Sequence, residues 1–403
     1  MERYDYIPRP LYMEKVKPYI NKDLIKVFLG QRRVGKSYVM RQVADEIQKD
    51  NVTANIIYID KERLEFSDII DEKTLYQFVC EHLCGQSNYL FIDEVQEIKN
   101  FQLALRSLLN ERKCDIYCSG SNAFILSGEL STYLSGRSIS IHVHALNYME
   151  YLQFYHMEPS RDSLRSFLLR GGMPYLVNLP DRREVIFEYL RSVYSTILLK
   201  DVVAHQSIRD VPFLEDLCQF LADNVGSLFS VKNISDYLKS QHISKSVSTI
   251  QNYLQALADA FLIYKVPRAE VQGMRIFEIG EKYYFEDFGI RNALRQIDIQ
   301  VDISKLMENA VYAELQSRGY QVYVGRTQEK EVDFVAIRNG ERVYVQVTYL
   351  LNSEKTIERE FGNLASIKDN YPKYVVSMDE YPVSQPYQGI VQLHLQDFLT
   401  KSL

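Results

Sequence analysis

The sequence predicts an α/β protein with a parallel sheet in its first part and a separate α/β module at its end. Through residues 1–150, apolar strands alternate with amphipathic helix patterns, as in a parallel sheet covered by helices on both faces. A glycine-rich turn, GQRRVGKS, joins the first strand to the first long helix pattern. Beyond residue 296 the order changes to helix, three strands and helix.

Length and composition limit the number of domains and the class of protein. A length of 403 residues predicts two to three domains. The composition, with 25% charged and 46% hydrophobic residues, is that of an ordinary globular protein. No apolar run approaches 18 residues and the first residues contain no apolar leader, so we expect no membrane segment and a cytoplasmic location. The odd number of five cysteines, without zinc-site spacing, predicts reduced thiols.

Five strands are expected in the first 150 residues, separated mostly by helices. They cover residues 24–29, 54–60, 88–93, 114–120 and 138–146. His142 and His144 share one face of the fifth strand, but nothing nearby completes a metal site, so packing is the better interpretation.

The turn GQRRVGKS fits the pattern G-x-x-x-x-G-K-[ST], with a strand before it and a helix after it. This order lets backbone N–H groups surround phosphates at a helix N-terminus. Lys36 is then expected to reach the β- and γ-phosphates of ATP, and Ser37 to bind Mg²⁺. The predicted ATP-binding residues here are Gly30, Gln31, Arg32, Arg33, Val34, Gly35, Lys36, Ser37 and Tyr38.

The segment NYLFIDEVQ places two acids at the end of the third strand. Asp93 is the expected Mg²⁺ ligand, and Glu94 the base that polarises the attacking water. The alternative is that this acidic pair caps a helix beginning at EVQEI. The phosphate loop upstream in the correct order favours the catalytic interpretation.

The motifs GQRRVGKS, IDEVQ, GSN and LSGR, in this order, resemble a prokaryotic family of AAA+ ATPases. The resemblance implies that Asn122 or Ser121 positions the lytic water. It implies that Arg137 is an arginine finger, often supplied by a neighbouring subunit, and hence a possible homo-oligomer. A structural salt bridge for Arg137 and a turn for Ser121 and Asn122 stay open as alternatives.

The segment LRSFLLRGGMPYLVNL resembles the lid of the signal-transduction branch of these ATPases. The resemblance makes Gly172 and Pro174 candidate adenine contacts and places Arg9, in YIPRPLY, near the base or ribose. A plain loop between helices is the alternative for each of these residues.

Residues 213–266 show three helices and a strand, a spacing that resembles a winged helix-turn-helix. Its recognition helix would present Ser248, Gln251, Asn252 and Gln255 to duplex DNA. Five basic and five acidic residues between 214 and 268 give little attraction to phosphates, so a protein partner is the open alternative.

The last hundred residues resemble the restriction-endonuclease-like domain at the end of the same AAA+ family. In active nucleases of this kind, a helix Glu, a strand Asp and a Glu-x-Lys on the next strand bind Mg²⁺ and activate water. Here the corresponding residues are Glu308, Asp333, Gln346 and Thr348. Two charges are missing, so we expect a degenerate site without cleavage, in which Glu308 and Asp333 hold the strands together.

The sequence thus predicts an AAA+ core (1–150), a helical lid (151–208), a winged-helix region (209–295) and a restriction-endonuclease-like domain (296–403). The leading hypothesis is an ATPase with Mg²⁺ that moves its lid and winged helix, in DNA-related, defence or regulatory work. The alternatives are an ATP-regulated DNA nuclease and a non-hydrolysing nucleotide switch that acts as a scaffold or DNA-binding regulator.

Overall fold

The computed structural model describes residues 6–85, 87–126, 136–204, 208–240, 243, 245–295, 299–327, 330–381, 387 and 389–401. It has the mixed α/β class that the sequence predicts. The chain forms two compact units. The first consists of residues 1–144 with 259–261, and the second of residues 145–258 and 262–403.

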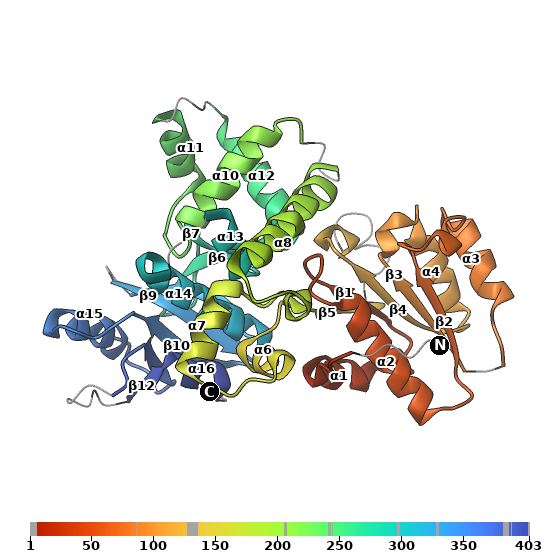
Figure 1. The fold of residues 1–403 in the computed structure, drawn as a ribbon, viewed down its shortest axis with the longest axis horizontal. Helices are drawn as coiled ribbons and strands as arrows, with labels where there is room; N and C mark the ends of the chain where they lie inside the picture. Colours follow the sequence, from red (N-terminus) through yellow and green to blue (C-terminus); the bar gives the residue numbers. More distant parts are fainter. Residues whose placement is uncertain are drawn as a thin grey trace. The chain divides into compact units, whose positions relative to one another are not determined.

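The first unit is built on five parallel strands, in the order β2-β3-β4-β1-β5 (Figure 1). Their bounds are β1 Ile25–Leu29, β2 Asn55–Asp60, β3 Asn88–Asp93, β4 Asp115–Gly120 and β5 Ser138–His142. Strands β1 and β3 are buried along their whole length, as expected for strands covered on both faces. The predicted fifth strand is shorter than expected, because the pairing of β5 with β1 ends at His142 opposite Leu29.

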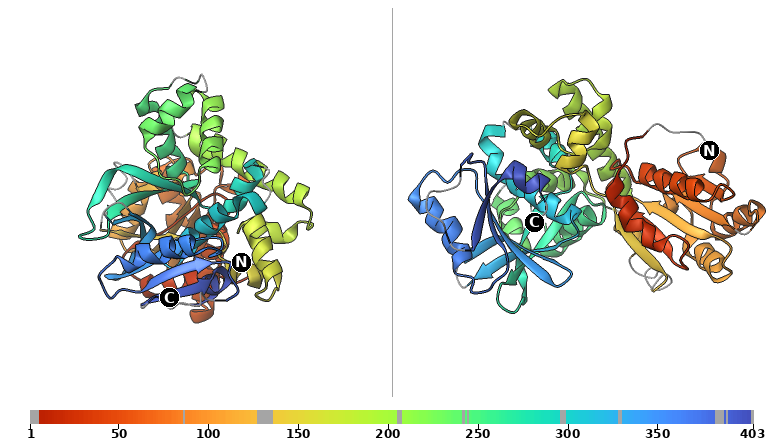
Figure 2. Two further views of the ribbon diagram at one scale, coloured as in Figure 1. Left: turned by 90° about the vertical axis from the view of Figure 1, so that its left-hand side faces the viewer. Right: turned by 90° about the horizontal axis from the view of Figure 1, so that it is seen from below.

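Helices pack against this sheet, and Figure 2 shows them flanking the strands. They are α1 (Pro10–Val16), α2 (Lys36–Asp50), α3 (Glu72–Glu81) and α4 (Phe101–Asn110). Local sequence explains where they begin. Pro10 occupies the first turn of α1, where its missing N–H costs nothing, and Asp71 with Thr74 forms a capping box at α3.

The second unit begins with helices. Its elements up to residue 259 are α6 (Tyr148–Tyr155), α7 (Arg161–Arg170), a 3₁₀ turn (Pro174–Asn178), α8 (Arg183–Thr196), a π-helical segment (Ile197–Val203), α10 (Val211–Asp223), α11 (Val231–Ser240) and α12 (Val247–Asp259). A hairpin follows, β6 (Ile263–Glu270) and β7 (Ile276–Phe285), and then α13 (Phe288–Arg295). The three helices α10 to α12 followed by β6 have the order expected from the sequence for residues 213–266, and the winged-helix assignment stays a prediction.

A second sheet of seven strands has the order β12-β11-β10-β9-β8-β6-β7. Its later elements are α14 (Ile299–Ser317), β8 (Gln321–Thr327), β9 (Lys330–Arg338), β10 (Glu341–Val347), α15 (Glu354–Ala365), β11 (Lys373–Ser377), β12 (Ile390–His394) and α16 (Leu395–Thr400). The pairing of β6 with β8 makes the sheet continuous across the expected boundary at residue 295. The domain limits themselves stay predictions.

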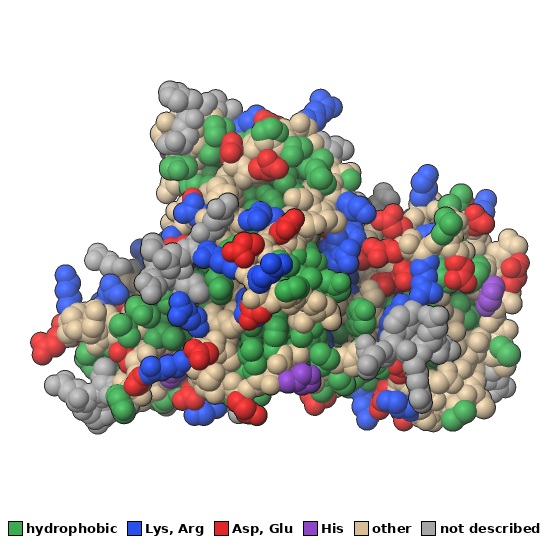
Figure 3. All heavy atoms as spheres, viewed as in Figure 1, with side chains coloured by type: hydrophobic (Ala, Val, Ile, Leu, Met, Phe, Trp, Pro, Cys, Tyr) green, Lys and Arg blue, Asp and Glu red, His purple; other side chains and the backbone are tan. Residues whose placement is uncertain are grey.

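Basic and acidic side chains are interspersed over the face drawn in Figure 3, in keeping with a net charge of −6. Among the described helices, none combines the length and apolar character needed to span a bilayer.

Candidate functional site

The loop between β1 and α2 has a shape that only glycine permits at two positions. Gly30 has φ 152°, and a Cβ there would lie 2.1 Å from the carbonyl oxygen of Val143. Gly35 is left-handed, with φ 97°, at the start of α2. Both glycines therefore let the backbone turn tightly between the end of a buried strand and a helix N-terminus.

Lys36 lies inside this loop rather than on the surface. Its side chain is buried, and the Nζ atom donates hydrogen bonds to the carbonyls of Gly30 and Gln31, each 3.0 Å away. The buried side-chain amide of Gln31 has no hydrogen-bond partner among the residues that the structure describes. A buried ammonium, an unsatisfied amide and a helix N-terminus form a cradle suited to an anion with several oxygens.

Asp93 lies at the carboxyl end of β3 and is buried. Ser119, in the adjacent strand β4, donates a hydrogen bond to its carboxylate, and Ser37 is a second donor. Burial raises the pKa of Asp93 and the nearby Glu94 carboxylate adds to this, while the two serines and Lys36 oppose it. Ser37 and Asp93 thus offer adjacent hard oxygen ligands, which fit Mg²⁺.

Glu94 has a strained, left-handed backbone with φ 55°. Its N–H donates to Ser119 Oγ at 3.0 Å, and its carboxylate accepts hydrogen bonds from Gln96 and from Ser121 Oγ at 3.2 Å. The 3₁₀ turn that follows, Val95–Glu97, has no side-chain cap, so the structure provides no support for the helix-cap alternative.

The electrostatics of Glu94 differ from those of Asp93. Burial raises the pKa of Glu94, but the charges of Lys36 and Arg32 and the hydrogen bonds from its neighbours outweigh burial, so the net pKa is lowered. The carboxylate is therefore ionised near neutral pH, as a base requires.

Arg9 is buried against the back of the loop. Its guanidinium donates to the carbonyls of Val34 at 2.9 Å and His144 at 3.0 Å, and its backbone N–H donates to Gln42. These contacts give Arg9 a role in supporting the loop, which the sequence did not indicate.

The remaining loop residues differ in exposure. Arg32 is buried and pairs with Glu62 at 3.5 Å. Arg33 is exposed with φ 71°, and Tyr38 is half exposed on α2. Of these three residues, Arg32 is the one whose charge acts on Glu94, together with that of Lys36.

Ser121 and Asn122 follow β4 directly and are buried at the same edge of the sheet. Ser121 contacts Glu94, as a residue that positions water would. Sequence analysis missed Ser119, two residues earlier, which contacts both acids. Its place at the strand end in CSGSN is the signal that could have indicated it.

Arg137 lies at the other edge of this sheet. Its carbonyl accepts the N–H of Ile25 at 2.8 Å, at the start of β1, whereas the phosphate loop follows the end of β1. Four residue steps along a strand span about 13 Å. Arg137 therefore lies away from the phosphate loop of its own chain, and part of its predicted LSGR motif lies outside the described residues.

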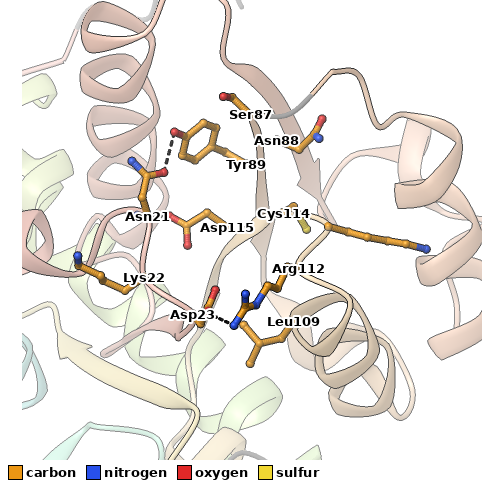
Figure 4. Close-up of a pocket in the computed structure, with 11 residues that line it drawn as sticks. Asn21, Lys22, Asp23, Ser87, Asn88, Tyr89, Leu109, Arg112, Cys114 and Asp115 are labelled. Carbon is orange, nitrogen blue, oxygen red and sulfur yellow. Dashed lines mark hydrogen bonds and ion pairs between the residues drawn. The ribbon is translucent and has the colours of Figure 1, made fainter.

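A small cavity of about 180 Å³ also lies at this amino-terminal edge (Figure 4). Tyr89 donates to Asn21 at 2.8 Å, and Arg112 pairs with Asp23 at 3.3 Å. Lys113 and Asn88, also in the wall, pair with residues outside it, so we assign no ligand to this cavity.

Gly172 and Pro174 belong to the second unit. Gly172 donates its N–H to Asp287 at 2.6 Å and accepts the N–H of Leu146 at 2.7 Å. A Cβ on Gly172 would lie 2.2 Å from the Leu146 oxygen, so close packing accounts for this glycine. Pro174 opens a 3₁₀ turn, and its predicted contact with adenine stays a prediction.

The predicted recognition residues Ser248, Gln251, Asn252 and Gln255 are all exposed. Three of them help to line a groove of about 580 Å³ between α11, α12 and the β6–β7 hairpin. Lys265 in this groove pairs with Glu281 at 2.6 Å, so part of its positive charge is neutralised.

The four positions predicted to form a degenerate nuclease site lie near one another in the second unit. Gln346 accepts the N–H of Asp333 at 3.3 Å, and Thr348 lies one residue beyond the end of β10. Glu308 and Asp333 both contact the ammonium of Lys282, on β7. Sequence analysis missed Lys282, because nothing in EIGEKYYF marks it as part of this site.

Two families match parts of the chain. Residues 22–152 match the family described as AAA domain, and residues 161–301 match a domain of unknown function. An uncharacterized protein of Haemophilus influenzae is 33% identical over 402 residues, covering 98% of each chain. The uncharacterized protein MJ1544 of Methanocaldococcus jannaschii is 28% identical, covering 87% of this chain and 82% of its own.

Solved structures resemble the chain only weakly. AMPPCP-bound DnaA from Aquifex aeolicus has a TM-score of 0.33 at 16% identity, covering 53% of this chain and 75% of its own. The Aeropyrum pernix ORC1 protein in complex with DNA has a TM-score of 0.30 at 12% identity, covering 74% of this chain and 95% of its own. At these scores the likeness supports no inference about this chain.

Proposed function

The chain belongs to the family of the Haemophilus influenzae protein, with an AAA domain over residues 22–152, and from this premise we propose that it binds ATP with Mg²⁺ and hydrolyses it. The observation that supports this most directly is the meeting of Lys36, Asp93 and Glu94 at one edge of the parallel sheet. Ligands of open α/β sheets bind at the carboxyl ends of the strands, where these residues lie.

Each residue has a distinct role in this proposal. Lys36 and the loop N–H groups hold the phosphates, and Ser37 and Asp93 hold Mg²⁺. When bound, Mg²⁺ neutralises charge on the transferred phosphoryl group. Glu94 orients the attacking water and accepts its proton, and Ser121 and Asn122 keep that water in place. Arg9 supports the loop from behind.

Two substitutions test the proposal. Lys36→Ala should abolish ATP binding, whereas Glu94→Gln should keep binding but lower turnover by about a hundredfold or more. Lys49→Ala is the matched control, because Lys49 lies on the same helix with a side chain 72% exposed. Phosphate release and equilibrium binding of labelled ATP measure both steps. Wild-type turnover in Lys36→Ala would refute the proposal, and tight binding without turnover in the unmodified protein would favour a non-hydrolysing switch.

Arg137 is proposed to act on the ATP site of a second copy, since it lies away from its own. Turnover per molecule should then rise with protein concentration. A mixture of Arg137→Ala and Glu94→Gln proteins should regain activity, because one mixed interface has an intact ATP site and an intact arginine. Concentration-independent turnover would leave Arg137 with a structural role.

The winged-helix region is proposed as the output of the ATPase, with α12 facing duplex DNA. The exposed Gln251 and Asn252 support base contacts, while the charge balance predicts weak salt dependence. Fluorescence anisotropy with a labelled duplex, with and without ATP, tests this, and the Gln251→Ala, Asn252→Ala double variant is the specific control. No binding under either condition would favour a protein partner instead.

A further inference from the structure

Lys282 lies at the centre of the degenerate nuclease site. Its Nζ atom is 2.9 Å from a Glu308 oxygen, 2.9 Å from a Glu331 oxygen and 3.2 Å from an Asp333 oxygen. The lysine side chain is only 3% exposed. One ammonium group therefore contacts three carboxylates in a buried setting, where long cationic side chains are rare unless paired.

The cluster joins elements that are far apart in the sequence. Lys282 lies on β7, Glu308 on α14, and Glu331 and Asp333 on β9. Further hydrogen bonds fix the carboxylates: Tyr284 donates to Glu308 at 2.6 Å, and the Val347 N–H donates to Asp333 at 2.9 Å. Because the carboxylates of Glu308 and Asp333 are each held by a second donor, these two groups have a defined geometry around Lys282.

A divalent cation does not fit this arrangement. A metal ion would need the position between the carboxylates that the Lys282 ammonium fills. Gln346 and Thr348 supply no negative charge, so the site offers less attraction than a complete nuclease centre. Among the described residues, no group of three or more His, Cys, Asp and Glu side chains is placed to hold a metal ion.

We propose that Lys282 takes the place of the divalent cation in this site and makes it a metal-free ionic joint between the β6–β7 hairpin, α14 and β9. The joint fastens the winged-helix hairpin to the nuclease-like layer, and it explains how Gln346 and Thr348 can be uncharged while the carboxylates remain. This inference does not depend on ATP hydrolysis.

The test uses the full chain without nucleotide. Wild type should bind no Mn²⁺ at this site, so the change of its melting temperature with Mn²⁺ and its Mn²⁺ electron paramagnetic resonance titration should match those of Asp333→Asn, whose melting temperature without Mn²⁺ is set by the lost pair with Lys282. Lys282→Met leaves the carboxylates of Glu308, Glu331 and Asp333 uncompensated, with Asp333 buried and the other two partly buried, and should lower the melting temperature by about 5 °C or more. Mn²⁺ should restore that loss, because the vacated position is then a carboxylate-lined cation site.

A double variant separates this result from general misfolding. Lys282→Met, Glu308→Gln removes one of the uncompensated charges and should melt higher than Lys282→Met alone, with on the order of tenfold weaker rescue by Mn²⁺. Mn²⁺ binding to wild type that is lost in Asp333→Asn would overturn the proposal. A Lys282→Met protein as stable as wild type, or one that Mn²⁺ does not stabilise, would also overturn it. If Lys282→Met does not fold, the comparison of wild type with Asp333→Asn decides.

Discussion

Ser119 holds the two acids of the proposed ATP site, and its replacement by alanine is the sharpest test of that geometry. Its hydroxyl donates to the Asp93 carboxylate and accepts the Glu94 N–H at 3.0 Å, with all three residues buried. Ser119→Ala removes a hydrogen bond to a charged group and leaves a buried N–H unsatisfied. Each loss costs about 1–3 kcal/mol.

The unfolding free energy should fall by about 3 kcal/mol in total, because Ser37 still donates to Asp93 and reduces the cost of losing the Ser119 hydrogen bond. Calorimetric unfolding should show this loss in the transition of the first unit. ATP turnover should fall as well, since the spacing of the two carboxylates is no longer held.

Ser235→Ala is the matched control for this substitution. Ser235 is a buried serine of the second unit that makes one hydrogen bond, to the Lys245 carbonyl at 3.3 Å. Its loss should cost about 1 kcal/mol and leave ATP turnover unchanged. A Ser119→Ala protein within about 0.5 kcal/mol of wild type, with normal turnover, would refute the reasoning, since such changes are typical of surface positions.

Three further predictions concern the second unit. Burial raises the pKa of Asp287 to about 7, so this carboxyl binds its proton more tightly in the folded state than in the unfolded state. The unfolding free energy should therefore fall as pH rises from about 4 to about 7. Asp287→Asn should flatten that part of the profile in urea titrations, and an unchanged slope would contradict the assignment. Gly172→Ala should be severely destabilising in thermal melts, because the added Cβ meets the backbone of Leu146, and a protein that melts like wild type would contradict that close approach. A Cβ added at Gly362, in α15, would meet no atom within 4 Å. Gly362→Ala should therefore raise the unfolding free energy by about 0.5–1 kcal/mol, and a lower unfolding free energy would contradict this.

Several features could be predicted because they depend on neighbouring residues. The phosphate loop, α2 and the acids at the end of β3 follow from spacing within about ten residues, as do the strand positions. The α/β class and the parallel sheet are confirmed for the same reason. The ends of strands were less certain: β5 stops at His142, where its pairing partner β1 ends.

The contacts between distant segments were decided only by the tertiary structure. Ser119 reaches Asp93 because β4 lies beside β3, and Arg137 lies far from its own phosphate loop because β5 runs parallel to β1. The order of strands in a sheet carries no short-range signature in the sequence.

The cluster around Lys282, at the predicted nuclease-like positions, shows most clearly which features the sequence determined and which the tertiary structure decided. The sequence alone determined that Gln346 and Thr348 carry no charge, and that Glu308 and Asp333 still do. Only the tertiary structure decided what balances those acids, because Lys282 lies 51 residues before Asp333 in the chain yet donates to its carboxylate at 3.2 Å. A buried carboxylate needs a nearby positive charge or donor from whichever strand the fold brings close, and that choice is made by packing rather than by spacing.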